Sequence, residues 1–513
     1  MTRFEKLWQE DKGSALLFVA GSLVLLMGLA AMGTDLAWFY LNTSRVQRAA
    51  DAAALGGVVW LPNEPGTANG TAFNIATQNG YTTGVDGATV TPAPVPGEAN
   101  QLQVTVDDTV PTFFLKALGF DSMDISRSAI AEYIPPLKLG SPTNQFGNAC
   151  DPEYEGDPGF PVDCGDNFWA NIHGWFTHTS FGDAYSGHCQ GGSNDDEGCP
   201  VNDIARDTGY LYGIESGSGF TVEFVDLAFH NISGAINTTD QHRTGDRGCE
   251  EWGSAAANCG PTMIVNLYSP DPTPLDLTDN GAPVCTATIP PQAQIQEQVA
   301  GNGVPYTWQA PPGGCWSQSG SGIWVVQVLH QNPGATNDRA GLNRYSIRST
   351  SGQLFALGDF SIYNNATGST TSFYLAEVPD FYAGKTFVVE MFDPGEFTGA
   401  GTGYIQVMGA DGDIWDDGQC RLYNRPTGDP DGPWSQFGTI SAGSDCQEAT
   451  TTGEYNNRWL KFELDLPTTY SCDEVAGDCW WKINYVYPGG ATVSDTTTWR
   501  AFMIGNPIHL VGP

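Results

Sequence analysis

The chain has 513 residues and a formal net charge of −37, from 58 acidic and 21 basic residues. This length exceeds one ordinary hydrophobic core and predicts two or more domains. A charge this negative would be repelled by phosphate backbones, which argues against nucleic-acid binding. The 63 Gly, 33 Pro and charged fraction of only 15% favour β-rich, loop-rich extracellular modules over helical bundles.

The first predicted element is a helix over residues 14–61, and its first part is apolar on all sides. From Ser14 to Thr34 there is no charged residue and no proline. At 1.5 Å per residue, about 20 such residues are enough to cross a hydrocarbon core of roughly 30 Å. The sequence therefore predicts residues 14–61 as a transmembrane helix with a helical extension.

The extension is rich in small residues, and Pro62 is expected to end it because proline lacks the amide that a helix needs. Small residues let helices approach closely, as in membrane helix interfaces. We expect Ala50, Ala53 and Gly57 to pack against a helix of another protein, and therefore expect a leucine at Ala53 or Gly57 to impair that association while leaving membrane insertion intact.

Basic residues favour a cytoplasmic N-terminus at residues 1–13, where Arg3, Lys6 and Lys12 precede the apolar segment. A cleaved secretory signal is the alternative, because the segment is N-terminal and begins with positive charge. The apolar run is longer than a typical signal core and no convincing A-x-A site follows, which favours retention as an anchor.

A small α/β unit is predicted over residues 62–135. The pattern indicates a helix around 68–78, a strand near 88–91, a strand over 102–106, a helix around 112–118 and a strand over 124–133. The strand predictions rest on alternation, as in Leu102, Val104 and Val106.

An acidic residue near the end of the apolar helix is followed by Tyr-Leu, a basic pair and Ala-Asp-Ala-Ala-Ala-Leu, in the run GTDLAWFYLNTSRVQRAADAAALGGV. This run resembles the N-terminal segment of TadE/TadG-like Flp-pilus (tight-adherence) assembly proteins, and the unit after it resembles the small unit of that family. The resemblance covers about 135 of the 513 residues, and the remainder is not matched to a named family. It implies association with the membrane and with other pilus-assembly proteins or pilin helices.

Two motifs of related proteins can be compared with this sequence. Prepilin processing uses a glycine with glutamate at the fifth following position, whereas Gly13 is followed by Ser-Ala-Leu-Leu-Phe, so cleavage there is doubtful. Some family members carry a von Willebrand A domain, whose metal site needs D-x-S-x-S. Residues 124–128 match that string, but no buried strand ends there, and they read as alternating positions of the last strand of the unit.

None of the 12 cysteines precedes Cys150, and no C-x-x-C occurs, which favours a disulfide framework over a zinc site. Nearest-neighbour pairing is one arrangement among several that sequence allows. The neighbours are Cys150 and Cys164, Cys189 and Cys199, Cys249 and Cys259, Cys285 and Cys315, Cys420 and Cys446, and Cys472 and Cys479.

After a Pro- and Gly-rich linker over residues 136–160, the chain repeats itself. Short strands separated by Gly, Pro, Asn and Asp predict two tandem all-β sandwiches of jelly-roll type, over residues 161–365 and 366–513. The corresponding strands begin at Tyr210 and Tyr374, Thr221 and Val388, Ile264 and Tyr404, Trp324 and Trp459, Tyr345 and Trp481, and Phe355 and Phe502, and Cys285 and Cys420 follow the third pair.

The acidic loop from 411 to 418 is the best candidate for chemistry. Asp411, Asp413, Asp416 and Asp417 alternate through a Gly-containing turn and could supply oxygens to a structural Ca²⁺, although the spacing is not that of an EF-hand. A solvated turn is the simpler interpretation. Asp226 and Asp393 end equivalent strands, where capping a turn explains both.

The sequence contains none of the common catalytic motifs, and paired catalytic carboxylates stay an open alternative because 58 acidic residues contain such pairs at separations that the sequence does not give. His173, His178 and His188 lack the helical spacing of a zinc hydrolase, and no G-x-S-x-G elbow, phosphate loop or dinucleotide fingerprint occurs. Aromatic residues offer a sugar-binding alternative, with Trp480 expected to point outward. The candidates for stacking are Trp169, Trp175, Phe176, Trp480 and Trp481.

The sequence thus predicts a non-catalytic protein of the cell membrane with one pass, a cytoplasmic N-terminus and most of the chain extracytoplasmic or on the cell surface. Its role would be pilus-associated assembly or adhesion. One alternative is a secreted or anchored carbohydrate-binding or carbohydrate-active β-sandwich protein, with a glycan or other cell-surface ligand as partner. Another is a minor pilus subunit.

Overall fold

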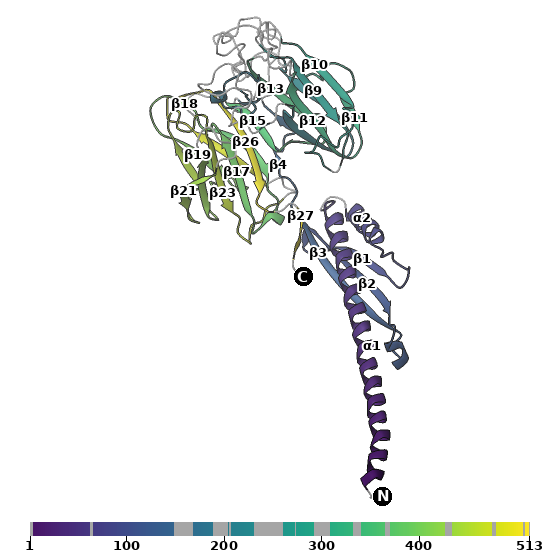
Figure 1. Cartoon of the computed structure of the whole chain (residues 1–513). Helices are drawn as coiled ribbons and strands as arrows, with labels where there is room; N and C mark the ends of the chain where they lie inside the picture. Colours follow the sequence, from purple (N-terminus) through teal and green to yellow (C-terminus); the bar gives the residue numbers. More distant parts are fainter. Residues whose placement is uncertain are drawn as a thin grey trace. The chain divides into compact units, whose positions relative to one another are not determined.

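A computed structural model describes residues 4–61, 65–147, 168–187, 204, 207–229, 260–271, 273–291, 308–331, 340–364, 370–425, 433–473, 479–505 and 508–511, with side chains from residue 16. Contacts divide the chain into two compact units (Figure 1). The first, here the helical unit, comprises Met1–Pro135 and Gly505–Pro513. The second, here the β body, comprises Pro136–Ile504.

The helical unit consists of two helices and a four-stranded antiparallel sheet of order β1-β2-β3-β27. Its elements are α1 (Phe4–Val58), α2 (Pro65–Gln78), β1 (Thr89–Val95), β2 (Glu98–Pro111), the 3-10 helix η1 (Leu115–Leu118), β3 (Ser122–Tyr133) and β27 (Ile508–Val511). Every element predicted between residues 14 and 135 is present, with longer strands and a shorter last helix than expected.

The core of the helical unit lies between its helices and one face of its sheet. Leu102, Val104 and Val106 of β2 are fully buried, as their alternation predicts, against Ala50 and Ala72 of the two helices. Small helix residues let the backbones come close to the sheet, so the unit needs few large side chains to exclude water.

The chain returns to the helical unit at its C-terminal end. Strand β27 pairs antiparallel with β3, from Ile508 opposite Tyr133 to Val511 opposite Ile130, and His509 lies 3.1 Å from Glu132. The β body is therefore inserted between two neighbouring strands of the helical unit. Residues 505–513 belong to that unit, whereas the sequence placed them in a second sandwich.

The β body contains two large antiparallel sheets. One has ten strands in the order β10 (Cys285–Ile289), β9 (Met263–Tyr268), β12 (Gly322–His330), β7 (Tyr210–Ser216), β14 (Gln353–Leu357), β4 (Lys138–Leu139), β16 (Thr370–Glu377), β24 (Trp480–Val486), β19 (Gly403–Met408) and β22 (Gln447–Thr450).

The other sheet has eleven strands, of which β5 (Gln145–Phe146) pairs with β13 beside the main path. That path is β11 (Ser317–Ser319), β8 (Gly219–Val225), β13 (Leu342–Ser349), β6 (Phe168–His173), β15 (Asp359–Asn364), β26 (Asp495–Met503), β17 (Thr386–Phe392), β23 (Trp459–Asp465), β20 (Cys420–Arg425) and β21 (Ser435–Ile440). The short strands β18 (Phe397–Thr398) and β25 (Thr492–Val493) pair separately, and the 3-10 helices η3 (Thr179–Phe181) and η5 (Asp380–Tyr382) lie in connections.

Strands from both predicted sandwiches share these sheets. In the larger sheet β15 pairs with β26, from Asp359 opposite Arg500 to Asn364 opposite Asp495. In the other sheet Leu139 of β4 pairs with both β14 and β16, so the predicted linker contributes a strand. Contacts consequently continue across the predicted boundary between residues 365 and 366.

Aromatic side chains from the two sheets contact each other. The hydroxyls of Tyr212 and Tyr345 are 2.8 Å apart, and the rings of Phe373 and Trp499 are 5.1 Å apart between centroids. These contacts place a buried aromatic layer between the two sheets. Aromatic residues make up 12% of the chain, and their large side chains fill this space.

The first three strand correspondences of the predicted repeat occupy matching places: β7 and β16, β8 and β17, and β9 and β19. The last three were wrongly matched. Trp324 lies in β12 of the ten-stranded sheet, whereas Trp459 lies in β23 of the other sheet, and the next two pairs are also split between sheets. A Trp-led apolar strand reads alike in either sheet because both sheets bury one face.

Candidate functional site

The first half of α1 presents apolar side chains to its surroundings over residues 16–34, here the exposed segment. Phe18 is 76% exposed, and Leu17, Val24 and Leu25 are also exposed. The most apolar window within Leu16–Val58 has a mean hydropathy of 2.3, and none of it is buried by the rest of the chain. By length and composition this helix is able to cross a membrane.

The second half of α1 is buried by its own unit from Val46 to Val58, here the small-residue segment. Ala50 and Ala53 are fully buried, and a Cβ placed on Gly57 would lie 2.5 Å from Leu102 Cδ2 and 2.8 Å from the Ala68 carbonyl oxygen. These three residues pack within the helical unit, against α2 and β2, and contact of this surface with a helix of another protein stays a prediction. A partner helix would first have to displace α2.

A family model matches a segment that includes both halves of this helix. Residues 13–59 match the model of the family described as putative Flp pilus-assembly TadE/G-like. The match confirms the resemblance read from the sequence over this TadE/G-like segment and leaves the other residues unmatched. The comparison with curated proteins found no match.

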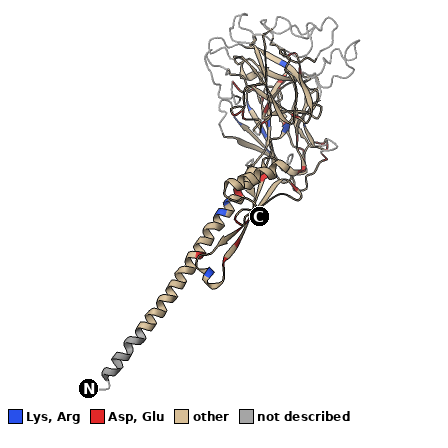
Figure 2. Cartoon of the chain, turned by 90° about the vertical axis from the view of Figure 1, so that its right-hand side faces the viewer, with Lys and Arg blue, Asp and Glu red and all other residues tan. Residues whose placement is uncertain are grey.

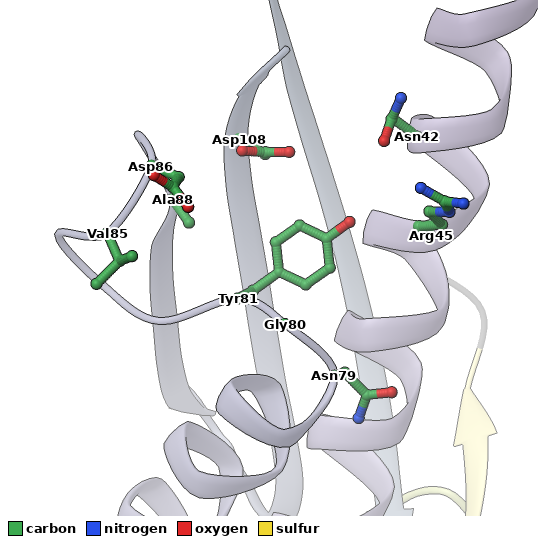
Figure 3. A pocket seen from close by; sticks show the side chains of 9 residues that line it. All are labelled: Asn42, Arg45, Asn79, Gly80, Tyr81, Val85, Asp86, Ala88 and Asp108. Atoms are coloured by element: carbon green, nitrogen blue, oxygen red, sulfur yellow. The ribbon is translucent and has the colours of Figure 1, made fainter.

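A polar pocket of about 500 Å³ adjoins the TadE/G-like segment. Figure 3 shows Tyr81, from the turn after α2, directed toward Asn42 and Arg45 of α1, with Asp108 of β2 nearby. Burial and the charge of Asp108 raise the pKa of Tyr81, while Arg45 and Arg48 oppose this shift. The lining of this pocket contains no Ser, Cys or Lys beside a His, so it offers hydrogen bonds and charges without a nucleophile–base pair.

The acidic loop forms a tight turn after β19. Asp411 Oδ1 accepts a hydrogen bond from the Asp413 amide at 3.1 Å, and the Trp415 amide donates to the Val407 carbonyl. Over the described part of the chain, which includes this loop, no three His, Cys, Asp or Glu side chains are grouped to hold a metal ion. The geometry therefore does not bring Asp411, Asp413, Asp416 and Asp417 together as a calcium site.

Asp226 and Asp393 take equivalent backbone conformations at the ends of β8 and β17, with φ of 53° and 60°. Both are buried, and Asp393 accepts a hydrogen bond from the Asn457 amide. Aspartate tolerates this left-handed conformation better than most residues, which agrees with the predicted turn role.

Three of the six expected cysteine pairs form disulfides: Cys285–Cys315, Cys420–Cys446 and Cys472–Cys479. Cys285 and Cys420 begin strands of different sheets, and their partners precede strands of the opposite sheet, so these two bonds connect the layers. Cys150, Cys164, Cys189, Cys199, Cys249 and Cys259 lie outside the described residues.

The aromatic residues predicted to stack on sugars do not form an exposed surface. Trp169 and Trp481 are fully buried, Trp175 and Trp480 are also buried, and Phe176 is half-buried. Trp480 lies on the face of β24 opposite to Trp481, where it packs against Tyr374 at 6.2 Å between ring centroids. Lys482 and Asn484 on that face are half-buried, so Trp480 is covered locally by its aromatic neighbour.

Of the three histidines, His173 and His178 are buried and His188 lies outside the described residues. The D-x-S-x-S string lies in β3, where Asp124 accepts a hydrogen bond from Thr109 and Ser128 contacts Thr105. This agrees with the strand prediction for residues 124–133.

Sequence reasoning missed Asp183, which is fully buried beside η3. Its carboxylate accepts hydrogen bonds from the amides of His173 at 2.6 Å and Tyr185 at 2.9 Å, and from the hydroxyl of Tyr210. Burial raises its pKa from 3.8 to about 6, although these donors and Arg344 act in the opposite direction. No local motif marks this residue, because its partners come from three different elements.

Proposed function

We propose that the chain is a membrane-anchored, non-catalytic component of a Tad/Flp-type pilus apparatus, with its β body outside the cytoplasm. The observation that carries this proposal is that the family match at residues 13–59 covers a helix whose apolar half is exposed. Exposed apolar area is costly in water at about 25 cal/mol per Å², and a bilayer removes this cost.

The orientation follows from charge and disulfides. Arg3, Lys6 and Lys12 favour the cytoplasmic side for the N-terminus. Disulfides persist in oxidising compartments, and three of them lie in the β body. On this proposal the body is a two-layered sandwich held beyond the membrane, where it contacts other pilus-assembly proteins or pilin helices.

Fractionation of cells that make the full-length protein tests the anchor and its orientation together. We expect the protein in the membrane fraction after carbonate extraction, with its cysteines resistant to thiol alkylation until a reductant is added. Recovery in the soluble cytoplasm with reduced cysteines would refute the proposal.

Two finer questions remain within it. Recovery of the protein in sheared pilus fractions would identify it as a minor pilus subunit, whereas retention in the membrane would identify it as an assembly factor.

The structure offers no exposed tryptophan among the candidates for a carbohydrate-binding role, because these tryptophans are buried. We therefore do not favour it.

A further inference from the structure

The tip of the β2–β3 hairpin, residues 112–121, exposes four large apolar side chains. The exposed fractions are 57% for Phe113, 52% for Phe114, 70% for Leu118 and 62% for Phe120. A monomeric protein in water seldom presents such a group of aromatic and aliphatic residues together, so an apolar surface is expected to cover them.

The tip is fastened to α1 by a buried carboxylate. Asp35 accepts hydrogen bonds from the backbone amides of Phe113 at 2.8 Å, Phe114 at 2.9 Å and Leu115 at 2.6 Å, and it is fully buried. Charge-assisted bonds of this kind are shorter and stronger than neutral ones. They fix the height of the tip along the helix.

That height coincides with the end of the apolar run. The helix from Leu16 to Thr34 is about 28 Å long at 1.5 Å per residue, close to a hydrocarbon core of roughly 30 Å. Asp35 is the first charged residue after this run. Figure 1 shows the hairpin tip beside α1, and Figure 2, which colours the charged residues, shows it where the long uncharged stretch of α1 ends.

The neighbouring side chains suit a lipid headgroup region. The rings of Trp38 and Phe113 are 5.4 Å apart, and Tyr40 is exposed on the next part of the helix. Trp and Tyr gather at membrane interfaces, where their rings lie between the acyl chains and water. The tip carries one positive charge, Lys116, which anionic headgroups attract, and one negative charge, Asp121, at its last residue.

We propose that the hairpin tip is a second membrane contact. Phe113, Phe114, Leu118 and Phe120 insert into the interfacial zone of the leaflet from which α1 emerges, continuous with the exposed segment. This inference rests on the proposed membrane anchoring. Two contacts, a spanning helix and an interfacial hairpin, fix the rotation and tilt of the helical unit on the bilayer, which a single helix leaves free.

The test places the photoreactive residue p-benzoylphenylalanine at one phenylalanine at a time in the full-length protein, reconstituted in vesicles of phosphatidylcholine and phosphatidylglycerol. Phe120 reports the hairpin tip and Phe18 reports the spanning segment. Phe73, 40% exposed on α2 of the same unit, is the matched control. We expect lipid adducts at Phe120 and Phe18 and none at Phe73.

Each other outcome has a separate meaning. Lipid adducts at Phe18 without adducts at Phe120 would overturn the inference and leave the anchor intact. A protein adduct at Phe120 would overturn it in favour of a contact with a second copy of the chain. No lipid adduct at Phe18 would refute the proposed function itself.

Removing the fastening gives an independent check. In Asp35→Ala the tip loses its three amide contacts, and lipid adducts at Phe120 should fall about tenfold, since hydrogen bonds to a charged group no longer hold one conformation. Adducts at Phe18 should be unchanged. Asp51→Ala, on the same helix beside Gln47, is the control and should leave both signals unaltered; an equal loss in both variants would overturn the role of Asp35.

Discussion

The two halves of α1 belong to one continuous helix, but they meet different surroundings. The exposed segment carries large apolar side chains that no described part of the chain covers, whereas the small-residue segment is buried by α2 and β2. One continuous helix thus makes two kinds of contact. Bulky side chains suit a disordered lipid surface, and alanine and glycine suit close contact with a fixed protein surface.

The difference changes which part of the helix is available to other proteins. Alanine- and glycine-rich stretches are typical of helix–helix interfaces, so the sequence favours an intermolecular role for Ala53 and Gly57. In the folded unit that interface is already filled from within the chain. Contacts with pilin helices or assembly proteins would therefore involve the exposed segment or surfaces of the β body.

A charge in the exposed segment should have the largest effect. Leu25→Arg places a cation at the middle of the apolar run, where insertion costs about 3 kcal/mol. Membrane recovery after carbonate extraction should fall sharply, while hydrogen exchange of the β body stays as in the wild type. Leu25→Ala, which adds no charge, should retain insertion. Full insertion of Leu25→Arg would contradict a lipid contact at this position.

A bulky residue in the small-residue segment should instead damage the fold. In Gly57→Leu the new side chain meets Leu102 and the Ala68 backbone, and overpacking of this kind costs about 3 kcal/mol. Hydrogen exchange over α2 and β2 should accelerate in detergent micelles, and membrane insertion should persist. The same change at Gly70, whose Cβ position on α2 is open, should leave exchange unchanged or slower. Equal effects at both positions would contradict the packing.

The stability of the β body, unlike the packing of α1, should depend on pH. A carboxyl whose pKa is raised by folding binds protons more tightly in the folded state, so stability falls as pH rises from 3.8 to about 6. For Asp183 this is a loss of about 1 kcal/mol between pH 5 and 7, and the raised pKa values of buried Asp393 and Asp495 act in the same direction.

The unfolding midpoint of the β body should therefore be higher at pH 5 than at pH 7, as followed by tryptophan fluorescence of the full-length protein. Asp183→Asn should flatten this dependence even though it lowers the midpoint at both pH values. The exposed Asp411→Asn should leave the slope unaltered. A body that gains stability toward pH 7 would contradict the burial of these carboxyls.

The smallest effect is expected at the margin of the small-residue segment. Gln47 donates hydrogen bonds to Asp51 at 2.7 Å and to the Ser128 carbonyl of β3 at 3.3 Å. Gln47→Met keeps the volume and removes both bonds, so the unit should lose about 1 kcal/mol by denaturant titration. A loss as large as that of Gly57→Leu would show that polar contacts, not small residues, dominate this interface.

Local pattern was sufficient for much of the helical unit. Alternation located β2, the absence of charges located the exposed segment, and the run from Gly33 to Val58 carried the family resemblance that the match confirms. These features depend on neighbours in sequence. The identity of a surface that covers a helix does not, which is why the composition of residues 50–57 predicted packing but assigned it to another protein.

Long-range contacts account for what sequence reasoning missed. Asp35 binds amides about 80 residues away, and β27 pairs with a strand that precedes the whole β body. Likewise, nothing local distinguishes the Trp324 strand from the Trp459 strand, although they lie in different sheets. Burial of the candidate sugar-binding tryptophans follows from a second sheet that composition alone does not position.

The division of α1 into a lipid-facing and a protein-facing half can be tested directly by labelling. The full-length protein would be reconstituted with lipids that carry a photoactivatable acyl chain, and adducts would be mapped by mass spectrometry of peptides. We predict adducts throughout residues 16–34 and none over residues 46–58. Adducts across the small-residue segment, or their absence from the exposed segment, would contradict the account.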